Sequence, residues 1–113
     1  MTTTNHYWVS IGRNRKGTTT PLDSGDWDEF QDSIRRSAAL WGTCTGVEVH
    51  GHSTWEGTGP EETFLLLLEI REDSVDGLRS SLARTADWYD QEAIGLVGGP
   101  GETLVQADPT LWA

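Results

Sequence analysis

The segment Thr63–Ile70 constrains the fold most, because it is the one place where apolar residues run almost unbroken. It is too short for an ordinary buried helix and far too short to cross a bilayer, so we predict a central β-strand. Because side chains alternate along a strand, it has two different faces. One face carries Phe64, Leu66, Leu68 and Ile70. The other carries Leu65, Leu67, Glu69 and Arg71, and what covers its two leucines is the main functional question.

Length and charge limit the class of protein. We expect one domain spanning residues 1–113, with a frayed lead at 1–5 and a tail at 107–113. The chain has 8 Lys and Arg against 18 Asp and Glu, a net charge of −10, which argues against direct nucleic-acid binding. The one cysteine, Cys44, excludes an internal disulfide and suits the cytoplasm. No signal peptide or membrane association is expected.

The patterning predicts a mixed chain of strands and helices. Strands are expected at His6–Ile11, Cys44–Trp55, Thr63–Ile70, Gln91–Val97 and Thr103–Gln106. Helices are expected from Ser24 or Asp26 to Gly42, and from Asp73 or Ser74 to Tyr89. Asp26 and Glu29 fit a capping box at the start of the first helix. This order predicts an α+β fold, a ferredoxin-like βαββαβ sandwich with a C-terminal β-hairpin extension, and right-handed crossovers put both helices on one face.

The second predicted strand carries one candidate polar site. Glu48, His50 and His52 alternate along it and would share a face at about 6–7 Å spacing, as a metal site or an acid/base pair requires. The spacing selects no third metal ligand, so the simpler interpretation is a solvated face of an edge strand, and no metal or other cofactor is expected. Gly51 within this strand indicates a bulge or an edge.

A second candidate is the basic cluster in the loop that follows the first strand. Arg13, Arg15 and Lys16 concentrate positive charge there and could attract a phosphate or a carboxylate. The segment is not a P-loop, because Thr18 stands where that motif requires lysine. The simpler interpretation is a solvated loop.

The sheet face that carries Leu65 and Leu67 is a candidate interface. Trp8 joins it from the first strand, together with either Ile94 and Leu96 or Ala93 and Val97 from the fourth. Exposed apolar patches of this kind are unusual on a monomer. A second copy of the chain, a different protein or the chain's own Leu111–Trp112 tail would cover it. We predict a homodimer, since twofold dimers are the commonest oligomers.

Several short segments together resemble small uncharacterised proteins of actinobacteria and their phages. They are Tyr7–Gly12, Trp27–Phe30, Trp55–Gly57, Glu61–Thr63 and Gln91–Ile94. The resemblance covers most of the chain, but its motifs are structural and carry over no catalytic residue. It implies a phage or actinobacterial cytoplasmic origin.

Three functions remain open at this point. The leading hypothesis is a non-enzymatic, phage-derived binding protein that acts on a host protein or a signalling molecule. The alternative is a small enzyme or ligand-binding protein whose pocket lies over the open sheet face and uses Glu48, His50 and His52. A structural or assembly component is the third.

Overall fold

A five-stranded antiparallel sheet, covered on one face by two helices, forms the protein. The computed structural model describes residues 3–55, 59–98 and 101–112. The strands are β1 (Thr4–Gly12), β2 (Thr43–Trp55), β3 (Gly59–Arg71), β4 (Ala93–Gly98) and β5 (Gly101–Gln106). The helices are α1 (Ser24–Trp41) and α2 (Val75–Trp88), with short 3₁₀ segments η1 (Glu72–Ser74) and η2 (Pro109–Trp112). The predicted α+β class is therefore confirmed.

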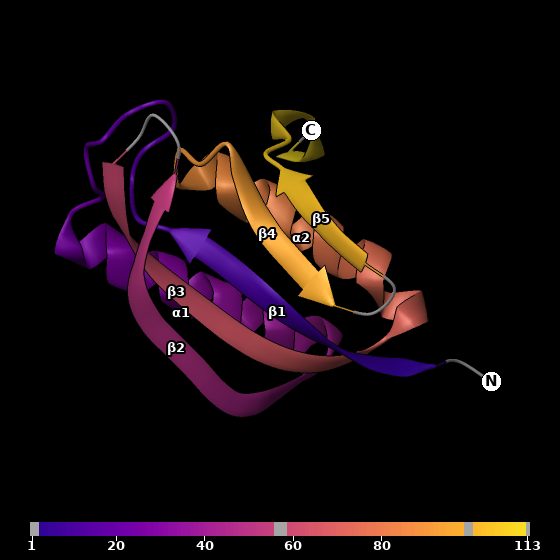
Figure 1. Ribbon diagram of the computed structural model, residues 1–113. Helices are drawn as coiled ribbons and strands as arrows, with labels where there is room; N and C mark the ends of the chain where they lie inside the picture. The colour runs from indigo at the N-terminus through magenta and orange to yellow at the C-terminus, as the bar shows by residue number, and fades with distance from the viewer. Residues whose placement is uncertain (1–2, 56–58, 99–100, 113) are drawn as a thin grey trace.

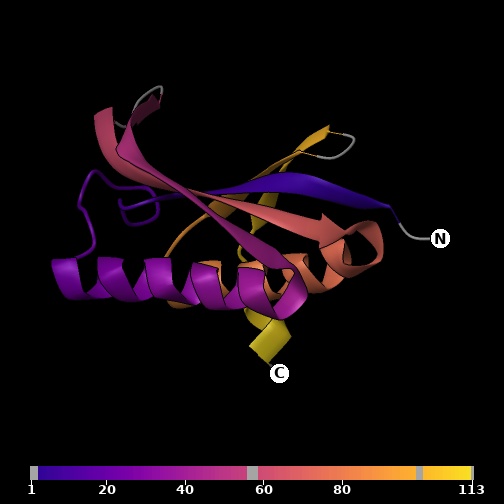
Figure 2. The ribbon, with the colours of Figure 1, turned by 90° about the horizontal axis from the view of Figure 1, so that it is seen from below.

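The strands lie in the order β2-β3-β1-β4-β5, as Figure 1 shows. The leucine-rich strand β3 pairs with β1 on one side and β2 on the other, so it lies inside the sheet as predicted. The strand that carries His50 and His52 lies at one edge, and β5 lies at the other as the second strand of a terminal hairpin. Figure 2 shows both helices beneath the same face of the sheet.

The core lies between that face and the helices. Phe64, Leu66, Leu68 and Ile70 of β3 are each at most 2% exposed, which confirms the predicted face. The apolar side chains of α1 pack against them: Trp27, Phe30, Ile34 and Ala38 are buried, and Trp41 packs against the core at the end of the helix. The helices are thus held by burial of an amphipathic face.

The structure corrects three local predictions in whole or in part. The side chain of Asp23, not Asp26, caps α1, accepting a hydrogen bond from the Asp26 backbone N–H at 2.8 Å. Gly51 was expected to mark a bulge or an edge: β2 is an edge strand, but its register shift falls between Cys44 and Glu48, where Gly46 has a φ of +87°. Strand β1 begins at Thr4, where a frayed lead was expected, because it pairs with the end of β3.

The tail after β5 returns to the helical side of the sheet. The backbone N–H of Asp108 donates to the carbonyl of Ala83 in α2 at 3.3 Å, and η2 contacts the same helix. In Figure 2 this segment lies on the side of the sheet that carries the helices. The Leu111–Trp112 tail, one of the three candidates for covering the open face, therefore lies on the opposite side of the sheet. None of the described helices is long and apolar enough to span a membrane.

Candidate functional site

The sheet face away from the helices is the candidate site. Trp8 in β1 lies opposite Leu67 in β3 and Val97 in β4, and Leu65 lies opposite Val49 in β2. Trp8, Leu65 and Leu67 are partly buried by their neighbours, whereas Val49 is 45% and Val97 38% exposed. The predicted placement of Trp8, Leu65 and Leu67 on one face agrees with this register. We call this surface the open face.

The fourth strand resolves the choice between its two sets of side chains. Ile94 and Leu96 are at most 1% exposed and belong to the core. Ala93 and Val97 have the opposite parity and therefore lie on the open face. Gly95, between them, lies opposite Ser10 and leaves the middle of that face without a bulky side chain.

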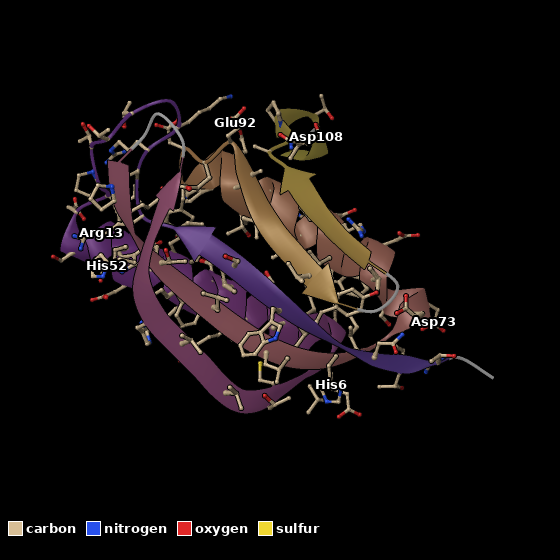
Figure 3. The ribbon with its side chains drawn as sticks, in the orientation of Figure 1. His6, Arg13, His52, Asp73, Glu92 and Asp108 are labelled. Carbon is tan, nitrogen blue, oxygen red and sulfur yellow. The ribbon has the colours of Figure 1, made fainter. Side chains whose placement is uncertain are left out.

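A carboxylate stands at each end of the open face. Glu69 in β3 lies opposite His6 in β1, and its carboxylate oxygen is 3.7 Å from His6 Nε2. Glu61 has the same parity on β3 and lies at the other end, near Gly12. Figure 3 shows His6 and Arg13 at the two ends of β1, so they mark the length of the site.

Glu61 is a carboxylate with a perturbed pKa. Burial raises the pKa of Glu61, while the backbone N–H of Asn14, 3.4 Å from Glu61 Oε1, acts in the opposite direction. The carboxylate lies directly against Gly12, where a Cβ would be only 1.5 Å from Glu61 Oε1. The lack of a side chain at Gly12 therefore makes room for Glu61. A half-buried carboxylate on a largely apolar face is a candidate functional group, and sequence reasoning did not select it.

The triad Glu48, His50 and His52 points to the other side of β2. Glu48 lies opposite Leu66, His50 opposite Phe64 and His52 opposite Glu62, so all three follow the parity of the helix-covered face. The prediction that they line a pocket over the open face is wrong. The two-residue period shows which residues share a face, but the register with β3 decides which face it is.

Glu48 and His50 have structural partners. Arg35 of α1 donates to both carboxylate oxygens of Glu48, at 2.8 and 2.9 Å, and to Asp32 at 2.6 Å. These hydrogen bonds lower the pKa of Glu48. The Arg35 guanidinium carbon lies 5.0 Å from the centre of the Phe64 ring, and the His50 ring centre lies 5.1 Å from it. The group closes the edge of the core where β2 passes over α1.

The basic cluster is only partly available to an anion. Arg13 donates to Glu62 at 2.7 Å and to the carbonyl of Leu22 at 2.7 Å. Arg15 Nη2 lies 4.0 Å from a carboxylate oxygen of Asp26, and Lys16 is exposed. Of the three residues predicted to attract a phosphate or a carboxylate, Arg13 and Arg15 therefore already form ion pairs with acidic residues of the same chain.

Metal and thiol chemistry find little support in the described ranges 3–55, 59–98 and 101–112. No group of three or more His, Cys, Asp and Glu residues is placed there to hold a metal ion. The pKa of Cys44 is raised, first by burial of its sulfur and then by the charge of Glu48, so its reactive thiolate form is disfavoured.

No protein-family model matches this chain, and no curated protein matches it. Its fold is similar to two solved structures of a phage SAM lyase, one in complex with S-methyl-5′-thioadenosine and one in the apo state. Sequence identity is 14% and 12%, and the TM-score is 0.61 for both. Each match covers 92% of this chain and 90% of the other.

This similarity corrects the leading functional hypothesis. A non-enzymatic binding protein was expected, but the two similar structures are those of a phage enzyme, one of them in complex with a nucleoside. The alternative, a small enzyme, agrees better with that finding. The polar residues that this alternative assigned to the pocket are wrong, however, because Glu48, His50 and His52 do not lie on the open face.

Proposed function

We propose that this protein is an enzyme that binds S-adenosylmethionine on the open face and releases S-methyl-5′-thioadenosine. The observation that carries the proposal is the match of nearly the whole chain to nearly the whole of a phage SAM lyase. Because the identity is low, the match speaks for the fold, and the substrate is our inference from the chemistry of the face.

The open face suits a sulfonium cation. Trp8 on this face offers a ring face of the kind that attracts cations, and Glu61 and Glu69 supply negative charge at the two ends. The net charge of −10 would also raise the local concentration of a cationic substrate. A sulfonium centre beside Glu61 would favour the ionised form of that carboxylate and so lower its raised pKa.

The proposed reaction breaks the bond between the sulfonium sulfur and the γ-carbon of the aminobutyrate chain. Both electrons of that bond remain on sulfur, which becomes the neutral thioether of S-methyl-5′-thioadenosine. The four-carbon fragment leaves as a lactone if its own carboxylate attacks the γ-carbon, or as an unsaturated amino acid if a base removes a β-proton. Neither route consumes water, as the word lyase requires. Glu61 is our candidate for the group that holds the cation or takes the proton.

Incubation of the purified protein with S-adenosylmethionine tests the proposal. We expect S-methyl-5′-thioadenosine to accumulate, measured by liquid chromatography and mass spectrometry, well above the non-enzymatic background. Glu61→Gln should lower kcat/KM at least tenfold, about 1.4 kcal/mol of transition-state stabilisation. The matched control is Glu92→Gln, which removes one exposed carboxylate near the start of β4 and should leave the rate unchanged. A wild type without turnover would overturn the proposal.

Two further inferences concern the fold and the source of the chain. We infer that the order β2-β3-β1-β4-β5, with both helices on one face, is the predicted ferredoxin-like arrangement extended by β5 at the edge. The phage origin of the two similar structures supports a phage source for this chain.

We also propose that a second copy of the chain covers the open face. Trp8, Leu65 and Leu67 form an apolar centre that the tail leaves uncovered, and a second copy would shield a substrate bound there from water. Light scattering should give twice the monomer mass for the wild type and the monomer mass for Leu65→Asp. Thr19→Asp, in an exposed loop, adds the same charge and should stay dimeric. A folded, monomeric wild type would exclude the dimer.

A further inference from the structure

Each helix carries the same short pattern, a serine followed three and four residues later by an arginine and a second hydroxyl residue. In α1 it is Ser33, Arg36 and Ser37, and in α2 it is Ser81, Arg84 and Thr85. Residues at these spacings lie on one side of a helix. Both patterns line one groove between α1 and α2, with a volume of about 270 Å³ and Leu40 at its edge. The groove lies away from the open face, on the other side of the sheet.

The hydroxyl groups hold both arginines in place. Arg36 Nη2 donates to Ser33 Oγ at 2.9 Å, and Arg84 Nη2 lies 3.4 Å from Ser81 Oγ. Ser81 is only 5% exposed and also accepts a hydrogen bond from the indole N–H of Trp41 at 2.8 Å. The two walls of the groove therefore repeat one arrangement, an arginine anchored through one N–H to the serine of the preceding turn.

These arginines differ from most other cations of the chain. Arg13, Arg15, Arg35 and Arg71 form ion pairs with carboxylates. Among the residues that the structure describes, no ion pair joins Arg36 or Arg84 to a carboxylate, although the chain has 18 acidic residues. A guanidinium has five N–H donors, so Arg36 and Arg84 each have several N–H groups besides the one that lies against serine.

We propose that this groove is a second ligand site, which binds a phosphate-bearing small molecule. Guanidinium groups pair with phosphate oxygens through two parallel hydrogen bonds, and a phosphate has enough oxygens to accept donors from both walls at once. The hydroxyl group of Ser37 supplies a further donor from α1, whereas the hydroxyl group of Thr85 donates to the carbonyl of Ser81 at 2.9 Å. A single carboxylate has only two oxygens and would satisfy fewer of these donors.

Pyrophosphate is the probe for the first experiment. Isothermal titration of the wild-type protein at low ionic strength should show saturable binding with one site per chain, and acetate at the same ionic strength should not compete. The double variant Arg36→Gln/Arg84→Gln should weaken the affinity at least tenfold. The control is Arg79→Gln, which removes one charge from α2 at a residue outside the groove and should change the affinity less than twofold.

A second measurement needs no variant and so does not depend on the double variant folding. Pyrophosphate added to ¹⁵N-labelled wild type should shift the amide resonances of residues 33–40 and 81–85 before those of the 12–17 loop. Three results would overturn the proposal: no saturable binding, equal competition by acetate, or shifts centred on the loop with Arg13, Arg15 and Lys16. An equal loss of affinity in Arg79→Gln would also overturn it, because binding would then follow net charge alone.

Discussion

Truncation of two neighbouring leucines in β3 tests which face of the sheet forms the core. Leu66 is 2% exposed and lies opposite Val9, itself 0% exposed, so Leu66→Ala should cost about 2–5 kcal/mol. Leu65 undergoes the same deletion one residue earlier in the same strand, but its side chain is only partly buried, beside Ser10 and Val49. We expect Leu65→Ala to cost roughly 1 kcal/mol, because less of the apolar area of this side chain is buried in the folded protein.

Urea unfolding, followed by circular dichroism, measures the difference. With a slope on the order of 1–2 kcal/mol per molar urea, the two midpoints should differ by roughly 0.5–4 M, at equal slopes. Equal losses at both positions would refute the assignment of faces. Repeating the series at a tenfold higher protein concentration separates the dimer from the monomer. If a second copy covers the open face, only Leu65→Ala should lose more stability, relative to wild type, as concentration rises.

Three further predictions concern single side chains. Gly77→Ala should destabilise α2 by about 1–3 kcal/mol in thermal unfolding, against the usual gain in helix propensity, because a Cβ there would lie 2.3 Å from the Trp41 ring; a higher melting temperature would contradict this. The stability of Glu61→Gln relative to wild type should be greater at pH 7 than at pH 4. Burial raises the pKa of this carboxyl, so wild-type stability falls as pH rises through that raised value, and the variant lacks this loss. An unchanged pH profile would show that burial does not penalise the charge of Glu61. Arg35 lowers the pKa of Glu48, so Glu48→Gln should cost about 0–1 kcal/mol above the ordinary pKa of 4.5, and the difference should vanish as pH falls through the lowered value; a gap that persists at low pH would rule out this ion pair as its source.

Most of the fold could be predicted from the spacing of apolar residues along the chain. The strands and helices lie within a few residues of their expected positions, because an alternating pattern and a helical stripe each follow directly from burial on one side. The unbroken run at Thr63–Ile70 predicted an inner strand for the same reason. The cap of α1 was misplaced by three residues, since Asp23 and Asp26 both fit the preferred residue types and only the backbone conformation selects between them.

The candidate site was harder to predict, because it depends on contacts between distant segments. Glu48 appeared free in the sequence, and its partner Arg35 comes from a helix thirteen positions earlier. The pairing of Glu48 with Leu66 and of Val49 with Leu65 places Glu48 toward the helices and Val49 on the open face. Glu61 gave no sequence signal, since its setting comes from the missing side chain of Gly12 across the strand pair. The proposed function depends on the structural match, because no motif in the chain specifies a substrate.

The hydrogen bond between Trp41 and Ser81 gives the groove between the helices its own spectroscopic probe. The indole N–H of Trp41 and a guanidinium N–H of Arg84 lie within hydrogen-bond distance of the same hydroxyl oxygen, at 2.8 and 3.4 Å. An anion that draws Arg84 away would change the electron density on that oxygen, and the indole proton would respond. Selective ¹⁵N labelling of the six tryptophans, with Trp41→Phe to assign the signal, would let one resonance report occupancy of the groove while the open face is studied separately.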